Sequence, residues 1–277
     1  MGLRITTNLA SINGQRNMAE TQRNMQSSFA QLSSGSRINK SADDAAGLAV
    51  SETFKAQIRG FRQASRNAND AISLVQTSEG GLQEISNIVV RMRELGVQAA
   101  SDTVGDKERG MIDVEIQQLK QEVNRIAQST RFGDTHLLDG TGGQFDFQVG
   151  THNNDFEDRI KFDSAAQNAT LDNLGLGGLD YTNKEGAQEA LDMLDKASVQ
   201  VNKTRANLGA IQNRLQSTVN NLGVQDENLS AANSRIRDTD VASATADLTR
   251  NNVLLQANTA ALAQANQQTG LALKLIG

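Results

Sequence analysis

The stretch LDKASVQ VNKTRAN LGAIQNR LQSTVNN LGVQDEN LSAANSR I, residues 194–236, decides the fold because every seventh position in it is aliphatic. Side chains seven residues apart on an α-helix lie almost above one another, so the pattern predicts one apolar stripe along a helix over about 187–237. Such a helix would be about 75 Å long. We call the stripe the rod seam; its members are Leu194, Val201, Leu208, Leu215, Leu222, Leu229 and Ile236.

The rod seam cannot stabilise this helix without partners. Burial of seven aliphatic side chains contributes on the order of 10–20 kcal/mol. Ordering costs about 1–2 kcal/mol for each residue of the helix, which is more in total. The sequence therefore predicts a helix that packs sideways, against helices of the same chain or of neighbouring chains.

The composition agrees with an elongated helical protein. The 277 residues include no proline, cysteine or tryptophan, and aromatic residues make up 3%. Without proline, long helices meet no interruption, and a large globular core would normally contain more aromatic residues. The net charge of −5 predicts no general attraction to nucleic acid or anionic membranes. No apolar run approaches the length of a membrane span, so we expect no membrane insertion.

Three regions follow one another along the chain. Residues 1–128 have helical spacing interrupted by polar breaks at 33–41 and 101–106, and the helices on either side of the second break should pack antiparallel. Residues 129–186 hold six of the nine aromatic residues, and apolar residues alternate over 145–149 and 160–162, which predicts a β-hairpin. The third region contains the rod seam, a break at 237–240 and a second seven-residue stripe.

The two ends of the chain should form one region, 1–42 with 238–277, and residues 43–237 a second. The terminal stripes are thin, and Asn251 and Asn258 stand at companion positions, where asparagine costs stability but fixes register and partner. We expect the ends to pair firmly only inside an assembly. The predicted fold is mainly α, a long antiparallel helical or coiled-coil rod with a small β-hairpin. The predicted inner-core packing residues are Ile5, Leu9, Ile12, Leu248, Leu255, Leu262 and Ile276.

Catalytic, cofactor and metal sites find no support in the sequence. Its two histidines, His136 and His152, lack the spacing of a zinc motif. Asp43 and Asp44 are adjacent, so on a helix they would point apart; a helix N-cap by Ser41 or Asp43 explains this segment better. We expect no enzyme activity, no cofactor and no metal.

A row of basic residues allows three interpretations. Lys55, Arg59, Arg62 and Arg66 line one helix face, with Phe61 nearby. A nucleic-acid site would use such a face together with aromatic residues, but the chain is acidic overall. Pairing with acidic groups of a neighbouring subunit is favoured, and a solvated face is the simplest alternative.

Several motifs resemble those of bacterial flagellins. The N-terminal half carries QLSSGSRIN at 31–39, ADDAAGLA at 42–49, ASRNANDAIS at 64–73 and RMREL at 91–95. The C-terminal half carries LGAIQNRL at 208–215, SRIRDTD at 234–240 and LAQANQ at 262–267. The resemblance covers roughly 1–140 and 187–277. Many relatives carry a proline in the last segment, whereas QQTG at 267–270 has none.

The resemblance implies a short flagellin without the variable outer domains, which assembles helically into the hollow filament used for motility. It implies paired chain ends lining the channel, a surrounding helical layer with the hairpin, and export through the flagellar secretion channel without a cleaved signal peptide. The implied partners are further copies, sibling flagellins, an export chaperone at about 240–277, and the filament cap and junction proteins.

The resemblance also implies a patch that a host innate immune receptor recognises, with Arg91, Leu95 and Glu115 at the matching positions. A packing role explains the same residues: Arg91 in an intersubunit ion pair, Leu95 in a seam and Glu115 in solvent. Two functions remain as alternatives to the filament subunit, a hook–filament junction protein and a secreted coiled-coil effector.

Overall fold

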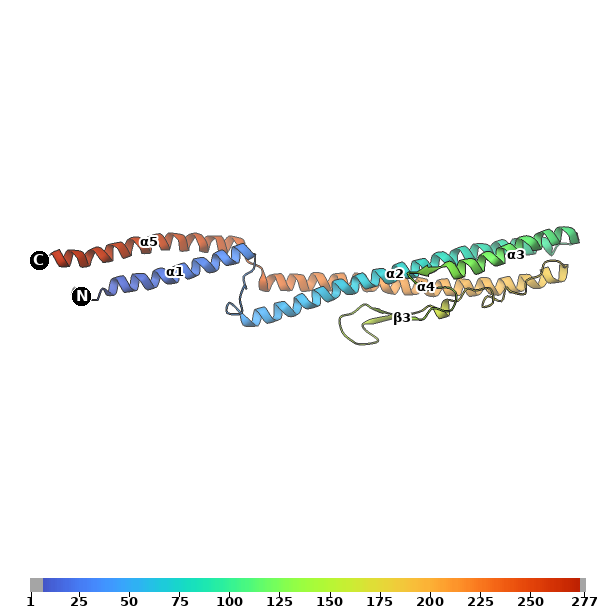
Figure 1. Ribbon diagram of the computed structural model, residues 1–277, viewed down its shortest axis with the longest axis horizontal. Helices are drawn as coiled ribbons and strands as arrows, with labels where there is room; N and C mark the ends of the chain where they lie inside the picture. Colours follow the sequence, from blue (N-terminus) through green and yellow to red (C-terminus); the bar gives the residue numbers. More distant parts are fainter. Residues whose placement is uncertain (1–6, 275–277) are drawn as a thin grey trace. The chain divides into compact units, whose positions relative to one another are not determined.

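The computed structural model describes the backbone of residues 7–274 and the side chains of residues 7–267. The prediction of a mainly helical fold is confirmed (Figure 1). The helices are α1 (Leu9–Ser34), α2 (Ala45–Ala99), α3 (Asp106–Ser129), α4 (Lys184–Arg237), α5 (Val241–Lys274) and a 3-10 turn, η1 (Ala165–Gln167). The strands are β1 (Arg131–Phe132), β2 (Thr135–His136), β3 (Gln144–Gln148) and β4 (Arg159–Asp163).

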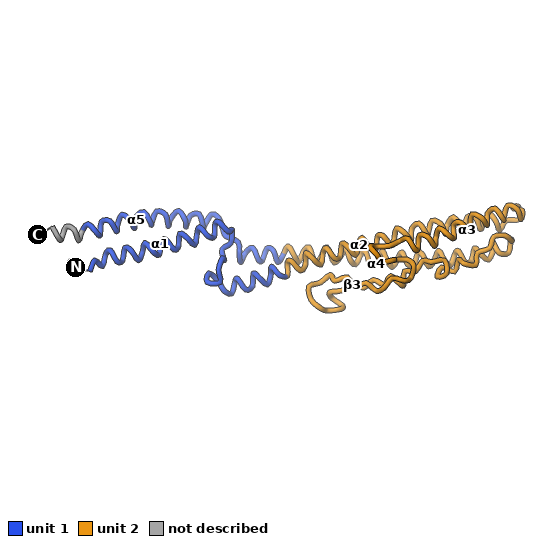
Figure 2. Tube along the Cα trace, viewed as in Figure 1, with its two compact units in different colours: residues 1–56, 228–277 blue, residues 57–227 orange. Residues whose placement is uncertain are grey.

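The chain divides into two compact units, coloured separately in Figure 2. Unit 1 comprises residues 1–56 and 228–277, and unit 2 comprises 57–227. The sequence-based boundaries at 42 and 238 fall near helix ends, whereas the units divide within α2 and α4. The first turns of α2 belong to unit 1 because they pack on the segment before them: a Cβ at Gly47 would lie 2.9 Å from Ile38, which is buried.

Asp44 is the residue that caps the start of α2. Its Oδ1 accepts a hydrogen bond from the Gly47 amide at 2.8 Å. Asp43 instead accepts bonds from the amides of Asn39 and Lys40, which closes the turn before the helix. The expected cap at Ser41 or Asp43 is therefore wrong by one residue, because the Asp43 carboxylate faces backwards along the chain.

Unit 2 has its own apolar core between α2, α3 and α4. Ion pairs between Arg91 and Glu115 and between Arg93 and Asp195 place α3 and α4 antiparallel to α2. The core contains side chains from all three helices and from the connecting segments, among them Leu82, Met92, Ile116, Val123, Leu137 and Phe162. Five rod-seam residues are also fully buried: Leu194, Val201, Leu208, Leu215 and Leu222.

The predicted hairpin is formed by β3 and β4. They pair antiparallel, with Phe145 opposite Phe162 and Phe147 opposite Ile160. The three phenylalanine rings lie 6.0–6.3 Å apart between centroids, within the range of favourable aromatic contacts. The face that carries them packs on the helical core, so the alternation in the sequence reports which side of the hairpin is buried.

Arg109 and the short β1–β2 pair were not predicted. Arg109 is 7% exposed; its guanidinium donates to the carbonyls of Ala99 and Ser101 and to Asp106. It therefore satisfies carbonyls at the end of α2 and fixes the turn into α3. A single arginine in a helical pattern gives no periodic signal, and strands of two residues are too short to show alternation.

The phenol of Tyr181 is buried in the core of unit 2. Its hydroxyl lies 3.4 Å from the Met92 carbonyl, and Gly96 leaves room for the ring. Burial, with a smaller effect of Asp113, raises the pKa of Tyr181 to about 12.

Tyr181 should make the stability of unit 2 fall at high pH. Because the pKa in the folded state is raised, the contribution of Tyr181 to stability is complete below its ordinary pKa of 10.0 and is lost as the pH rises towards about 12. Tyr181 is the single tyrosine of a chain without tryptophan, so tyrosinate absorbance reports this one group. We expect ionisation near pH 12 or together with unfolding; a midpoint near 10 in the folded protein would contradict this. Tyr181→Phe should weaken the pH dependence in this window, and the remainder should come from lysines such as Lys161, whose pKa is raised by Asp155.

Candidate assembly surfaces

The terminal helices α1 and α5 form an antiparallel pair in unit 1 (Figure 1). Two polar contacts join them: Asn8 Nδ2 donates to the Ala265 carbonyl at 2.9 Å, and Asn258 Nδ2 donates to Thr21 Oγ1 at 3.1 Å. The most buried side chains of α1 are Thr21 and Ser28, each 8% exposed. The centre of this pair is therefore polar, unlike the core of unit 2.

Large apolar side chains of unit 1 remain exposed on both helices. Leu9 is 62% exposed, Ile12 51% and Phe29 65% on α1, while Val253 is 60% and Leu254 45% exposed on α5. Exposed apolar residues also occur on unit 2, among them Phe156 and Val199, and singly they are normal. What distinguishes the terminal pair is that, among its described residues, no large apolar side chain is buried.

The predicted inner-core residues divide into three groups. Leu9 and Ile12 are exposed, and Leu248, Leu255 and Leu262 are half-buried between the two helices. Ile5 and Ile276 lie outside the described residues. Leu229 and Ile236, the two rod-seam residues that belong to unit 1, are half-buried. Within the described residues, none of these seven side chains is fully buried by its own chain.

A clamp of backbone and side-chain contacts holds the base of the terminal pair. Ser36 and Asp238 form an isolated antiparallel bridge, the Arg37 amide donates to the Arg237 carbonyl at 2.7 Å, and the Thr239 amide donates to the Gly35 carbonyl at 3.0 Å. Arg237 also pairs with Glu52 at 2.5 Å, which lowers the pKa of Glu52 below its ordinary value. We call these contacts the base clamp.

The three candidate receptor residues lie in unit 2, but they are not equally accessible. Arg91 and Glu115 form an ion pair at 2.9 Å and are 51% and 45% exposed, and the hydrogen bond to Glu115 raises the pKa of Arg91. Leu95 is only 3% exposed. A receptor could reach Arg91 and Glu115 but not Leu95 in this conformation. Arg91 has its ion-pair partner in the same chain, so its pairing does not require a second subunit.

The basic row also has partners within the chain. Arg62 pairs with Asp226 at 2.9 Å within unit 2, and Lys55 lies 3.7 Å from Glu52 within unit 1. Both pairs are largely exposed, and such pairs contribute little to stability. For these two residues the expected pairing with a neighbouring subunit is therefore already satisfied internally.

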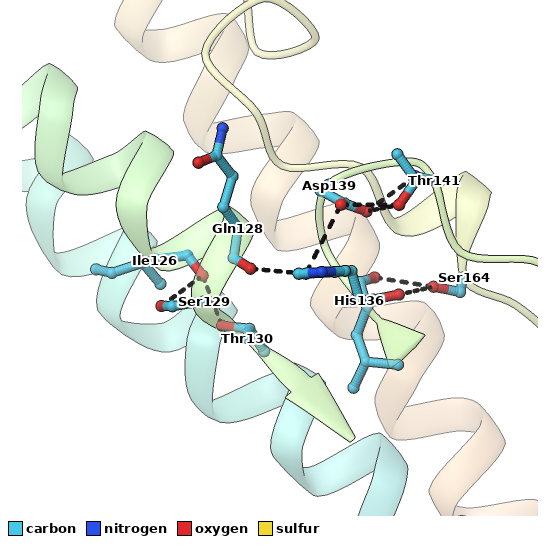
Figure 3. A network of polar contacts seen from close by, with 9 residues as sticks. Ile126, Gln128, Ser129, Thr130, His136, Asp139, Thr141 and Ser164 are labelled. Carbon is cyan, nitrogen blue, oxygen red and sulfur yellow. Dashed lines mark hydrogen bonds and ion pairs between the residues drawn. The ribbon is translucent and has the colours of Figure 1, made fainter. Parts of the chain in front are cut away.

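His136 belongs to a polar network in the loop-rich part of unit 2 (Figure 3). Its Nδ1 lies 2.7 Å from the Gln128 carbonyl and 3.8 Å from Asp139. Although burial alone raises it, the pKa of Asp139 is lowered overall by hydrogen bonds from Thr141. Ser164 donates to the carbonyls of His136 and Leu137. These contacts attach the β1–β2 turn to α3 and to the segment after β4.

The described residues contain no group of three or more histidine, aspartate and glutamate side chains placed to hold a metal ion. No helix among them is both long and apolar enough to cross a membrane.

Together these features define a class of protein, an elongated-helix protein without a metal cluster among its described residues, in which one unit has an apolar core and the described part of the terminal helix pair has none. A family model described as the bacterial flagellin N-terminal helical region matches residues 5–142. A second, described as the bacterial flagellin C-terminal helical region, matches residues 191–276.

Full-length relatives agree with both family models. A flagellin of Halalkalibacterium halodurans is 44% identical over 98% of this chain and 99% of its own length. A flagellin of Bacillus subtilis is 38% identical over 99% of this chain and 100% of its own. The crystal structure of Bacillus cereus flagellin matches with a TM-score of 0.51 and 32% identity, covering 61% of this chain and 94% of that one.

The chain belongs to the bacterial flagellin family. Its function is that of a structural subunit of the flagellar filament, and its location is the bacterial flagellum. The junction-protein and effector alternatives are not favoured. Flagellins are structural proteins, which agrees with the expectation that the chain is not an enzyme.

Proposed function

We propose that this flagellin assembles by coupled folding and polymerisation, in which unit 2 folds first and unit 1 becomes firm only when neighbouring copies cover it. The observation that carries this proposal is the contrast between the two units. Unit 2 has a continuous buried apolar core, although some of its side chains, such as Phe156 and Val199, stay exposed. In contrast, α1 and α5 meet through Thr21 and Asn258, and among the described residues neither helix buries a large apolar side chain.

Head-to-tail contacts between copies extend this proposal to a filament. A surface on one copy that fits a different surface on the next copy generates an open helical polymer when the contacts do not close into a ring. Leu9, Ile12, Leu248, Leu255 and Leu262 are the inner-core contacts in this proposal. The filament cap, the junction proteins and sibling flagellins then meet the same surfaces at the ends or along the polymer.

Before assembly the exposed side chains of α5 need protection. The proposal assigns residues of about 240–277 to an export chaperone, which would cover Val253 and Leu254 until the subunit leaves the cell. Export proceeds through the flagellar secretion channel, and the filament lies outside the cell. Recognition by a host receptor would use Arg91 and Glu115.

Seeded polymerisation of the purified chain tests the assembly proposal. Electron microscopy should show tubes with a central channel, and circular dichroism should show a gain in helicity on assembly. Phe29→Ser removes an exposed apolar side chain of α1 and should raise the critical concentration for polymerisation, while Phe156→Ser, at a 93% exposed position of unit 2, serves as the matched control. A chain that is already fully helical and never polymerises would contradict the proposal.

A further inference from the structure

We propose that asparagine–hydroxyl pairs between α1 and α5 set the register of the terminal pair, so that Asn258 and Thr21 are positioning residues for assembly. The question of register arises because the apolar stripe of α5 repeats without variation. Leu248, Leu255 and Leu262 are identical residues seven positions apart. A slip by seven residues would replace each leucine by another, so the leucines alone cannot define one alignment.

The polar residues at companion positions do distinguish the alignments. Asn258 donates to Thr21 across the pair. The helices run antiparallel, so a step of seven residues towards the base clamp leads from this contact to Ser28 on α1 and Asn251 on α5. A step of seven residues in the other direction leads to Gly14 on α1 and Ala265 on α5. In the observed alignment each asparagine therefore faces a hydroxyl residue, and glycine faces alanine.

A slip by seven residues breaks this correspondence. If Leu255 moved to the place of Leu262 beside Gly14, Asn258 would face Gly14, which has no side-chain acceptor, and Ser28 would face Ala244. The opposite slip would carry Asn251 beyond the end of α1 at Ser34 and place Ala265 against Thr21. Each slip loses one polar pair and leaves buried polar groups without partners, which is costly in a protein interior.

The base clamp also favours the observed alignment, but it acts at one end only. The connection between α1 and α2 comprises residues 35–44 and contains no helix, so α1 can shift if the bridge between Ser36 and Asp238 opens. Thr21 lies 15 residues before Ser36 of the clamp, and Asn258 lies 20 residues after Asp238. Register along α1 and α5 therefore depends on contacts that the clamp does not supply.

The absence of cysteine from the chain allows register to be read by disulfide formation. A Cβ placed at Gly14 would lie 3.9 Å from the Cβ of Leu262, close to the spacing of natural disulfides. The full-length pair Gly14→Cys with Leu262→Cys therefore reports the observed alignment, and Gly14→Cys with Leu255→Cys reports the slipped one. Intramolecular disulfides are scored on non-reducing gels, both in polymers and in the unassembled chain.

The variant Asn258→Leu tests the role of the polar pair. We expect the slipped disulfide to rise relative to the observed one by roughly five- to a hundredfold, the range for loss of one satisfied buried pair. Asn252→Leu, which adds the same side chain at an exposed position of α5, should leave the ratio unchanged. Ser28→Ala should also favour the slip, because Ser28 faces Asn251 only in the observed alignment and faces Ala244 in the slipped one, whereas Thr21→Ser should retain the observed alignment.

An unchanged ratio in both Asn258→Leu and Ser28→Ala would overturn the inference and assign register to the base clamp alone. The inference rests on the pairing of α1 with α5 in the assembly proposed above. If the Gly14/Leu262 cysteine pair failed to form a disulfide in polymers of the otherwise unchanged chain, both this inference and that pairing would be wrong. Scoring the unassembled chain as well keeps a variant that does not polymerise informative.

Discussion

Removal of either terminal segment, residues 1–30 or residues 248–277, should abolish polymerisation. Each deletion leaves the partner helix without the contacts that join α1 to α5, among them the bond between Thr21 and Asn258. It also removes exposed apolar residues, Leu9 and Phe29 in one case and Val253 and Leu254 in the other. Sedimentation and electron microscopy after seeding should show no filaments at concentrations where the full chain polymerises completely.

The truncated chains should nevertheless keep unit 2 folded. The core of unit 2 is built from residues 57–227, and the deletions do not touch it. Circular dichroism should show less helix but a cooperative thermal transition close to that of the full chain. Filaments formed by a truncated chain would contradict the assembly mechanism, and loss of the thermal transition would show that unit 2 depends on the chain ends.

Leu208→Ala should produce a large loss of stability. Leu208 is fully buried in the rod seam, and its truncation removes apolar contacts and leaves a cavity, which together cost about 2–5 kcal/mol. For a protein of this size the midpoint of thermal unfolding should fall by roughly 5–15 °C. Calorimetry on the monomer measures the shift.

Val199→Ala provides the matched control on the same helix. Val199 is 69% exposed, and alanine is the better helix former, so the midpoint should stay unchanged or rise slightly. Equal losses for Leu208→Ala and Val199→Ala would mean that the rod seam does not determine the stability of unit 2. A fall in the unfolding midpoint for Leu208→Ala but not for Val199→Ala would show that the seven-residue pattern reports the packing of α4.

The seven-residue pattern made much of the fold predictable because helix geometry turns periodic leucines into a continuous face. The predicted helix over about 187–237 corresponds to α4 at Lys184–Arg237, and the alternation around Phe145 and Phe162 corresponds to β3 and β4. Features that produce no repeating pattern of apolar residues could not be predicted from the sequence. Arg109 fixes the α2–α3 turn through carbonyl groups, and the hydrogen bonds of a single arginine leave no trace in the spacing of neighbours.

The assembly surfaces were harder to predict than the fold because exposure depends on which face of a helix meets its partner. The sequence placed Leu9, Leu248 and Leu262 in one class, yet Leu9 is exposed and the other two are half-buried. The candidate receptor residues on α2 likewise differ in the direction of their side chains. The Arg91 side chain points outward, and the Leu95 side chain points into the core. The asparagine positions were noticed from sequence, but their partners required the alignment of α1 with α5.

The contact between Thr21 and Asn258 joins residues 237 positions apart, and the contact between Asn8 and Ala265 joins residues 257 positions apart. Contacts between such distant parts of a chain form late, because closing a long flexible loop costs entropy before any contact is gained. Folding of unit 2 shortens that loop by bringing α2 and α4 side by side, as in the pair between Arg62 and Asp226. The joining of α1 to α5 is therefore favoured after unit 2 has folded, because the folded middle shortens the loop that this pairing must close.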